Sequence, residues 1–204
     1  MLKIFNRLLK NRSYSYMEEN KEQILIRRLL AKEEAAWKEL FGMHSGNLAG
    51  VCSRYLPGKD DVHDVLQNSF IKMFRSIETF EYRGLGSLKA WMMRITVNEA
   101  LKHIKQHSGV MADTDVNDFP DIAGDEEPDL EEISQAVIMK MIQSLPDGYR
   151  TVFNLFVFEK KSHKEIAELL GIAENSSASQ FHRAKGLLAR KINEYKMSKE
   201  AQYE

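Results

Sequence analysis

The sequence predicts an all-α fold, with two small helical domains joined by an acidic flexible linker and a helix-turn-helix in the second domain. Three observations carry this prediction. Apolar residues recur at helical spacing through most of the 204 residues, and no convincing alternating strand pattern is present. Residues 106–139 contain ten acidic residues and no Lys or Arg, and Pro120, Gly124 and Pro128 interrupt them. Two helical patterns flank Gly171, as in a helix-turn-helix.

These breaks divide the chain into five segments. We expect an N-terminal extension at 1–17, a first helical domain at 18–106, the acidic linker at 107–129, a second helical domain at 130–195 and a tail at 196–204. The extension is basic and its apolar positions are interrupted, so it lacks the continuous apolar core of a signal peptide. We favour Met17 as the functional beginning, because MEENKEQILIRRLL has the pattern of a helix start.

The formal net charge of −1 conceals an uneven distribution. Outside residues 106–139 the chain carries 29 basic and 20 acidic groups, a net charge of +9. Basic domains favour phosphate backbones, because each neutralised phosphate releases condensed counterions. The alternative is a basic surface that serves only solubility. No run of about 18 apolar residues is present, so we expect no membrane-spanning helix.

The first domain is expected to contain four helices. They cover residues 23–31, a segment that ends at 57–58, a segment from 60 or 61 to about 77, and a segment that starts near 87 after the loop ETFEYRGLG. In the third helix the expected buried stripe is Val62, Leu66, Phe70, Met73 and Ile77.

The opposite face of this third helix has an unusual composition. Ile71 lies there among polar residues, and one apolar residue surrounded by polar groups is typical of a small protein-binding surface. The alternative is an exposed isoleucine without a function. The face contains Asp61, Asp64, Gln67, Asn68, Ile71, Lys72 and Arg75.

The fourth helix has an edge suited to nucleic acid. Spacings of three or four residues place one aromatic ring, three cations and one amide along that edge. These residues are Trp91, Arg94, Asn98, Lys102 and Lys105. Such groups can stack on a base, hold phosphates and read a base edge. The preceding loop adds Phe80, Tyr82 and Arg83. Core packing is the alternative for Trp91, because Leu88, Met92 and Ile95 lie nearby on the expected buried side of this helix. Solubility is the alternative for the lysines.

The second domain is expected to contain a helix before Leu145, another through TVFNLFVFEK, and the helix-turn-helix. In its first helix Ser162 and Glu165 form a capping box, and Gly171 ends the helix. Ser176 is expected to cap the second helix, whose short polar groups and arginines suit a recognition helix. An ordinary helical hairpin is the alternative. The buried face of the second helix is expected to contain Ala178, Phe181, Leu188 and Ile192.

No catalytic or metal-binding constellation stands out. Glu99, His103 and His107 have the spacing of ligands on one helix, but no other His or Cys clearly completes a site. The single cysteine, Cys52, excludes an internal disulfide framework and is expected in the core. We therefore expect no cofactor, no metal, no small-molecule substrate and no enzymatic activity.

In this order, the segments resemble the extracytoplasmic-function (ECF) sigma factors of the sigma-70 family, the two-domain promoter-recognition subunits of bacterial RNA polymerase. The resemblance spans about residues 24–192. An acidic linker separates its second and third motifs. The motifs are DDVHDVLQNSFIKMFRSIETF, GSLKAWMMRITVNEALKHIK, LPDGYRTVFNLFVFEKKSHKEIAELLGI and NSSASQFHRAKGLLARK.

The resemblance implies a role for each surface. The exposed face of the third helix, from Asp61 to Arg75, matches the segment that grips the clamp of the largest polymerase subunit. Residues 152–158 lie in the lobe that docks on the flap of the second-largest subunit. The part that captures the melted −10 strand is matched by Tyr82, Arg83, Lys89, Trp91, Arg94, Asn98 and Lys102. The −35 recognition helix is matched by Ser176, Ser177, Ser179, Gln180, His182 and Arg183.

The resemblance further implies a cytoplasmic protein that binds core RNA polymerase and promoter DNA. It also implies that an anti-sigma factor, often at the membrane, controls this protein. Three departures stand out: Asn68 replaces a usual Glu, the Arg83–Gly86 loop is about a residue longer, and Ala178 and Gln180 replace common basic residues. Gln180 suggests an adenine contact rather than a guanine contact. The alternatives are a stand-alone helix-turn-helix regulator and a non-catalytic interaction module of the transcription machinery.

Overall fold

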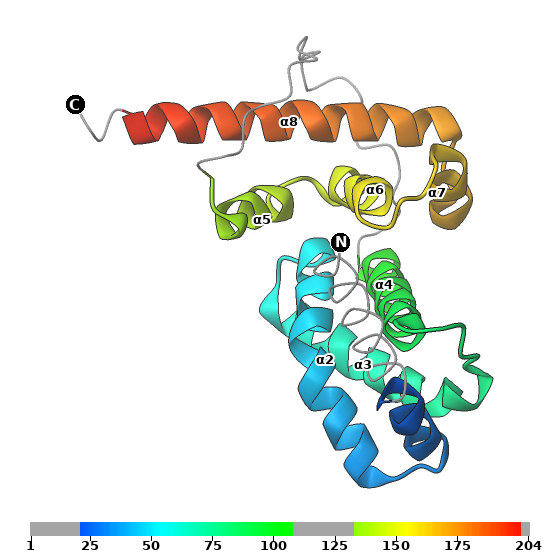
Figure 1. Cartoon of the computed structure of the whole chain (residues 1–204). Helices are drawn as coiled ribbons and strands as arrows, with labels where there is room; N and C mark the ends of the chain where they lie inside the picture. Colours follow the sequence, from blue (N-terminus) through cyan, green and yellow to red (C-terminus); the bar gives the residue numbers. More distant parts are fainter. Residues whose placement is uncertain (1–20, 108–132, 201–204) are drawn as a thin grey trace, which may run out of the picture. The chain divides into compact units, whose positions relative to one another are not determined.

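The computed structural model describes residues 21–107 and 133–200 (Figure 1). Every regular element in these two ranges is a helix, which confirms the all-α prediction. The predicted extension at 1–17, the linker at 107–129 apart from His107, and the last residues of the tail lie outside the described residues. Within the described helices, none combines the length and the apolar character needed to span a membrane.

The helix at residues 21–30 is followed by seven α-helices and a short 3-10 helix, η1, in the described ranges. The described chain forms two compact units: residues 21–52 with 62–99, and residues 53–61 with 100–107 and 133–200. The elements are α2 (Glu34–Tyr55), α3 (Lys59–Ser76), η1 (Ile77–Thr79), α4 (Ser87–His107), α5 (Gln135–Gln143), α6 (Asp147–Val157), α7 (His163–Leu170) and α8 (Glu174–Glu200).

The core of the first unit is built from the helix at 21–30 and from α2, α3 and α4. On α4 the predicted buried side is confirmed, since Leu88, Met92 and Ile95 are all at least nine-tenths buried. This packing fixes the direction in which the opposite edge of α4 faces. The fully buried members of this core with the largest side chains include Leu29, Leu40, Leu48, Met73, Ile77 and Met92.

The buried stripe of α3 differs in part from the prediction. Met73 and Ile77 are buried as predicted, but Val65 and Ser69 are the other fully buried positions near them. Ser69 is tolerated inside because its hydroxyl donates a hydrogen bond of 2.7 Å to the Val65 carbonyl oxygen. The remaining predicted positions, Val62, Leu66 and Phe70, are only half-buried.

In the second unit, α6 and α7 pack against the long helix α8 (Figure 1). A compact core forms from Ile142, Leu145 and Tyr149 on one side and Ala184 and Leu188 of α8 on the other. Burying a polar group costs free energy unless it is hydrogen-bonded, and the side-chain amide of Asn154 donates to the Arg54 carbonyl oxygen at 2.7 Å.

Arg150 is the most fully buried cation of this unit, with 3% of its surface exposed. Its guanidinium donates to the carbonyl oxygens of Gln143 and Leu145, at 3.2 and 2.8 Å, and forms an ion pair with Asp147. These bonds join the end of α5 to the start of α6 and so fix the turn between the two helices.

Helix α8 begins at Glu174, two residues before the predicted cap at Ser176. Its buried face is set by Ala184, Leu188 and Ile192, which are spaced four residues apart. About two turns before Ala184, the same face of the helix reaches Ser177, which is buried. The predicted core residue Ala178 is exposed. The prediction of Ala178 as a core residue is therefore wrong.

The start of α7 confirms the predicted capping box. The Ser162 hydroxyl accepts a hydrogen bond from the Glu165 N–H, and the Glu165 carboxylate accepts one from the Ser162 N–H at 2.8 Å. The helix ends at Gly171, whose φ of 73° lies in the left-handed region that glycine adopts without strain. Both ends of the first helix of the helix-turn-helix are thus set by local sequence.

We expect the stability of the second unit to fall as the pH drops below 4.5, the ordinary pKa of a glutamate side chain such as Glu165. Hydrogen bonds from the Ser162 backbone and side chain lower the pKa of Glu165, so they stabilise the fold above the unfolded-state pKa. That contribution is lost as the pH falls through the folded-state pKa. Thermal unfolding from pH 7 to 3 measures the loss, and Glu165→Gln, which keeps a capping side chain, should reduce this pH dependence. An unchanged pH profile in Glu165→Gln would contradict the assignment.

Candidate polymerase-binding and nucleic-acid-binding surfaces

The outer face of α3 has the composition that the sequence predicts. Asp64, Gln67, Asn68 and Arg75 are exposed around Ile71, which keeps 42% of its surface exposed. Their spacing places all five along one stripe of the helix, opposite Val65 and Met73. An apolar centre with charged and amide groups around it can serve as a small protein-docking surface.

Two further residues predicted on this face have partners within the chain. The Lys72 ammonium forms an ion pair of 2.6 Å with Glu99 of α4, whose side chain is only 10% exposed. The Asp61 carboxylate lies 3.0 Å from Nε2 of His103. A partner protein would therefore compete with these internal contacts, whereas Asp64 and Arg75 are the more exposed ends of the stripe.

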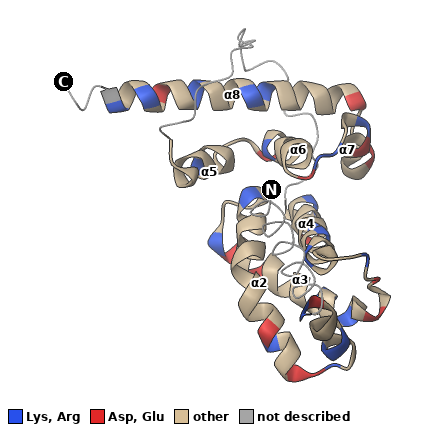
Figure 2. Cartoon of the chain, in the orientation of Figure 1, with Lys and Arg blue, Asp and Glu red and all other residues tan. Residues whose placement is uncertain are grey.

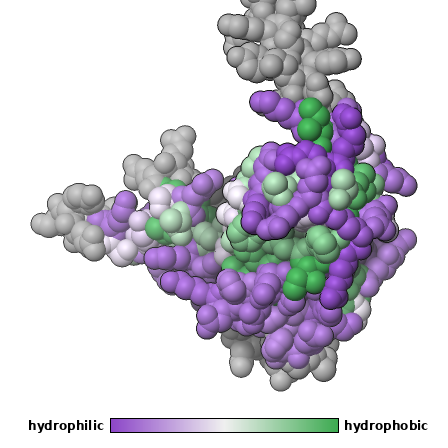
Figure 3. Space-filling view, turned by 90° about the horizontal axis from the view of Figure 1, so that it is seen from below, coloured by the Kyte–Doolittle hydropathy of each residue, from purple (hydrophilic) through white to green (hydrophobic). Residues whose placement is uncertain are grey.

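Sequence reasoning missed two exposed aromatic residues beside this stripe. Phe74 of α3 and Phe41 of α2 are 47% and 52% exposed. Phe74 packs edge-on against Trp37 at 5.0 Å between ring centroids, and Phe41 lies 4.9 Å from Phe70. Exposed hydrophobic side chains are also visible among hydrophilic ones in Figure 3. The signal was available, because Phe74 follows Ile71 by three residues and so lies next to it on a helix.

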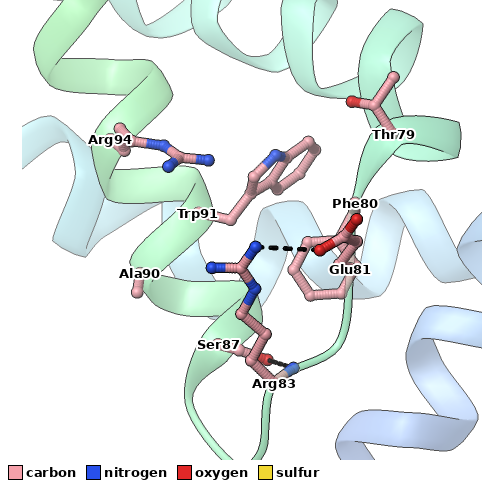
Figure 4. Close-up of a pocket in the computed structure, with 8 residues that line it drawn as sticks. All are labelled: Thr79, Phe80, Glu81, Arg83, Ser87, Ala90, Trp91 and Arg94. Atoms are coloured by element: carbon pink, nitrogen blue, oxygen red, sulfur yellow. Dashed lines mark hydrogen bonds and ion pairs between the residues drawn. The ribbon is translucent and has the colours of Figure 1, made fainter.

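A pocket of about 560 Å³ lies between the end of η1, the following loop and the start of α4 (Figure 4). It brings together four residues that the sequence predicted, Phe80, Arg83, Trp91 and Arg94, and adds polar and small groups that sequence reasoning did not select. Aromatic walls with two arginines suit an unpaired nucleotide, because a base can stack while the cations hold its phosphate. The added lining residues are Thr79, Glu81, Ser87 and Ala90.

Trp91 serves both the core and the pocket. It is 9% exposed, belongs to the core of the first unit, and packs edge-on against Phe80 at 5.4 Å between ring centroids. Core packing, the alternative that the sequence left open for this residue, is thus confirmed, and its contact with nucleic acid stays a prediction. Because its ring is fixed by the core, the wall that it offers to the pocket is rigid.

The charge in the pocket is not uniformly positive. Arg83 and Glu81 form an exposed ion pair of 2.9 Å, drawn as a dashed line in Figure 4. A carboxylate at this position repels a phosphate and holds one of the two cations. Arg94 has no such acidic neighbour among the residues that line the pocket.

The other predicted −10 residues extend from this pocket. Lys89, Asn98 and Lys102 are exposed on α4, where cations follow the helix (Figure 2). Tyr82 is half-buried and packs against the core of the first unit. The edge of α4 beyond the pocket can therefore hold the phosphate backbone of a nucleic-acid strand that extends out of the pocket.

On α8 the predicted −35 residues fall into two groups. Ser179 and His182 are exposed near the start of the helix. Ser176, Gln180 and Arg183 are half-buried on the side toward α6. The guanidinium of Arg183 donates to the Tyr149 hydroxyl at 3.3 Å. The first group forms the centre of the exposed face, and the second forms its border.

Ser177 does not belong to the exposed face, contrary to the prediction. It is fully buried, and its hydroxyl lies 3.0 Å from Nδ1 of His163 at the start of α7. His163 in turn stacks on Phe156 at 4.7 Å. Ser177 therefore helps to lock α7 against α8 instead of contacting DNA. Asn175 is also exposed near the start of α8. It was not selected from the sequence, because the helix begins at Glu174 and not at the predicted Ser176.

The possible metal arrangement on α4 is explained by other contacts. Glu99 pairs with Lys72, and His103 contacts Asp61. The rings of His103 and His107 stack at 4.1 Å. In the part of the chain that the structure describes, no group of three or more His, Cys, Asp or Glu side chains is placed to hold a metal ion. Cys52 is fully buried, and burial raises the pKa of its thiol to about 12.

The two halves of the chain match two family models. Residues 40–110 match sigma-70 region 2, and residues 135–188 match sigma-70 region 4. The chain is 27% identical over 186 residues to the ECF RNA polymerase sigma-E factor of Haemophilus influenzae, which covers 86% of this chain and 97% of the relative. It is 26% identical to that of Escherichia coli, over 86% and 96%. A solved structure, CnrH in complex with the cytosolic domain of CnrY, covers 83% of this chain at 19% identity and a TM-score of 0.45.

The chain therefore belongs to the sigma-70 family of RNA polymerase sigma factors. Within that family it is a member of the ECF group, as the sequence resemblance indicated. It is a sigma factor that directs transcription initiation through RNA polymerase and promoter DNA. The stand-alone regulator and the interaction module are not favoured by these similarities.

Proposed function

We propose that the outer face of α3 binds the clamp of the largest subunit of core RNA polymerase. The exposed apolar centre at Ile71, ringed by Asp64, Gln67 and Arg75, is the observation that carries this assignment. Phe74 and Phe41 widen the apolar area toward α2. A desolvated apolar centre inside a polar rim is the usual anatomy of a specific protein interface.

The pocket at the start of α4 captures an unpaired base of the −10 element. Phe80 and Trp91 supply the aromatic walls, and Arg94 faces the same space (Figure 4). Unstacking a base costs a few kcal/mol, which stacking and phosphate contacts offset. Capture of the extruded base therefore favours the melted state of the promoter, and this chain performs no covalent step.

The exposed start of α8 reads the −35 element in the major groove. Ser179 and His182 lie at the centre of this face, and Gln180 and Arg183 lie at its border.

Of the apolar segment 152–158, Val152 and Leu155 are core residues, whereas Phe158 is 39% exposed. Phe158 is therefore the residue of this segment best placed to meet the flap of the second-largest subunit.

We expect Ser179→Arg to change the −35 preference more than Gln180→Arg does. Position 179 is exposed, whereas the Gln180 side chain lies beside Gly148 of α6. Arginine contacts guanine through two hydrogen bonds, worth about 1–3 kcal/mol of discrimination. Transcription by the holoenzyme from a −35 promoter library measures the preference. Equal or reversed effects at the two positions would contradict the orientation assigned to α8.

The protein works in the cytoplasm, where polymerase and promoter DNA are, and an anti-sigma factor controls it. A surface that must stay exposed for the clamp, such as the Ile71 stripe, is also open to an inhibitor that covers it. Control by occlusion needs no change in the fold of either unit.

The experiment that tests the −10 assignment is binding of a labelled single-stranded −10 oligonucleotide. We expect the holoenzyme to bind it more tightly than core polymerase alone, and Arg94→Ala to weaken that binding by about tenfold while core binding is kept. Lys38→Ala, which removes an exposed cation of α2 that does not line the pocket, is the matched control. Equal losses in the two variants would reject the pocket as the binding site.

A further inference from the structure

Glu22, in the helix at residues 21–30, makes an unusual contact with the start of α4. Its carboxylate accepts two backbone hydrogen bonds across the first unit, one from the Gly86 N–H at 2.7 Å and one from the Leu88 N–H at 2.9 Å. The first N–H groups of a helix have no partner within that helix and need one from elsewhere. Here the partner comes from a residue more than sixty positions away in the sequence.

The loop that these bonds hold is anchored at its start, where Phe80 and Tyr82 pack against the core, and the bonds of Glu22 hold its other end. Gly84 and Gly86 both have positive φ, 109° and 86°, so the backbone turns sharply before α4. Within the loop, the Ser87 N–H donates to the Gly84 carbonyl oxygen at 3.1 Å, and the Arg83 N–H donates to the Ser87 hydroxyl at 3.3 Å. These short-range bonds shape the turn but do not attach it to the rest of the unit.

Glu22 is itself held firmly. One turn further along the same helix, Leu25, Ile26 and Leu29 are buried in the core of the first unit. Burial and the nearby charge of Lys89 lower the pKa of His44 on α2, and the negative charge of Glu22 partly counters that shift. The carboxylate of Glu22 thus lies between the helix at 21–30 and the start of α4, where the two backbone N–H groups reach it.

The loop matters because its side chains form one wall of the pocket. Glu81 and Arg83 line it from the loop, while Ser87, Trp91 and Arg94 line it from α4 (Figure 4). If Gly86 and Leu88 lose their acceptor, the loop can move relative to the fixed ring of Trp91. The width of the pocket then varies, and a base loses its ordered site.

We propose that Glu22 is the positioning residue of the −10 pocket, which it shapes through the Gly86 and Leu88 amides without contacting DNA. This inference rests on the proposed −10 function of the pocket. It assigns a role in promoter melting to a helix outside the segments that carry the pocket. The charge of Glu22 also counters the partial positive charge at the start of α4, which strengthens both bonds.

The test uses the full chain, free and bound to core polymerase, with Glu22→Ala and the isosteric Glu22→Gln. Glu39→Gln is the matched control, because Glu39 is a carboxylate of the same unit that accepts a hydrogen bond from the Arg28 side chain instead of from a backbone N–H. Three quantities are measured: amide hydrogen exchange at Gly86 and Leu88, affinity for a labelled single-stranded −10 oligonucleotide, and affinity for core polymerase.

In Glu22→Ala we expect faster exchange at Gly86 and Leu88 and about tenfold weaker oligonucleotide binding, with core affinity within about twofold of wild type. Glu22→Gln keeps one acceptor oxygen and should fall between Glu22→Ala and wild type. Exchange at Leu40, in the core of the same unit, should stay unchanged in both.

Two results would overturn the proposal: Glu22 variants that match Glu39→Gln in oligonucleotide affinity, or variants that lose core affinity and Leu40 protection to the same extent. In the second case Glu22 only stabilises the unit as a whole. Failure of the wild-type holoenzyme to bind the oligonucleotide would instead reject the −10 function of the pocket. The exchange at Gly86 and Leu88 separates these cases, because it reports the contact of Glu22 without any DNA.

Discussion

Replacing Ile71 by Glu is expected to weaken binding to core RNA polymerase by about 30-fold or more and to remove promoter-directed transcription. The loss of one central apolar anchor from a protein interface costs about 2 kcal/mol or more, and a buried unpaired carboxylate adds to it. Ile71 is 42% exposed in the free protein, so the fold itself should change in stability by no more than about 0.5 kcal/mol. Titration of labelled core polymerase measures the affinity.

Leu30→Glu is the matched control for this substitution. Leu30 is 41% exposed, similar to Ile71, but lies in the helix at residues 21–30 and not on α3. If Leu30→Glu weakens core binding as much as Ile71→Glu does, exposed apolar surface in general and not the α3 stripe binds the polymerase.

Replacing Trp91 by Ala has the second large expected effect, because this residue belongs to the core and to the pocket. We expect the free energy of unfolding to fall by about 3–5 kcal/mol, as for other buried aromatic residues. We also expect the loss of measurable binding to a single-stranded −10 oligonucleotide, since one wall of the pocket disappears. Chemical denaturation and oligonucleotide titration of the holoenzyme give the two quantities.

Met92→Ala separates the two effects of the Trp91 substitution. Met92 is fully buried next to Trp91 but does not line the pocket. Removing the Met92 side chain should lower the free energy of unfolding by about 2–5 kcal/mol. The affinity for the oligonucleotide should be kept at temperatures at which the variant is still folded. If Met92→Ala loses the oligonucleotide to the same degree, the pocket has no specific role and the binding follows stability alone.

The helices and the helix-turn-helix were predictable because short-range signals define them. Ser162, Glu165 and Gly171 mark both ends of α7 through contacts within a few residues. The apolar period of α4 correctly placed Leu88, Met92 and Ile95 inside. Such features need only local geometry, which the order of residues encodes.

The errors arose where distant segments meet. Ser177 is buried because His163 of the preceding helix reaches its hydroxyl, and no period of apolar residues reveals that bond. Lys72 and Asp61, predicted on the polymerase-binding face of α3, contact Glu99 and His103 of α4, and the sequence did not indicate these contacts. Glu22 escaped notice for the same reason, since its partners are backbone groups of residues 86 and 88.

The two proposed DNA-binding surfaces need not bind tightly on their own. When two weak sites are linked, binding at one raises the effective concentration of the other, but only at a spacing that both can span. The predicted acidic linker at 107–129 lies between the two domains in the sequence. We therefore expect weak promoter binding by the free protein and strong, spacing-dependent recognition by the holoenzyme.

The most direct test of the central claim is transcription in vitro from a promoter library by purified core RNA polymerase, with and without this protein. The account predicts new transcripts that start downstream of a shared pair of motifs, one near −35 and one near −10. The Ile71→Glu variant should give none of these transcripts. If the wild-type protein binds core polymerase but yields no new transcripts, promoter recognition by this chain is contradicted.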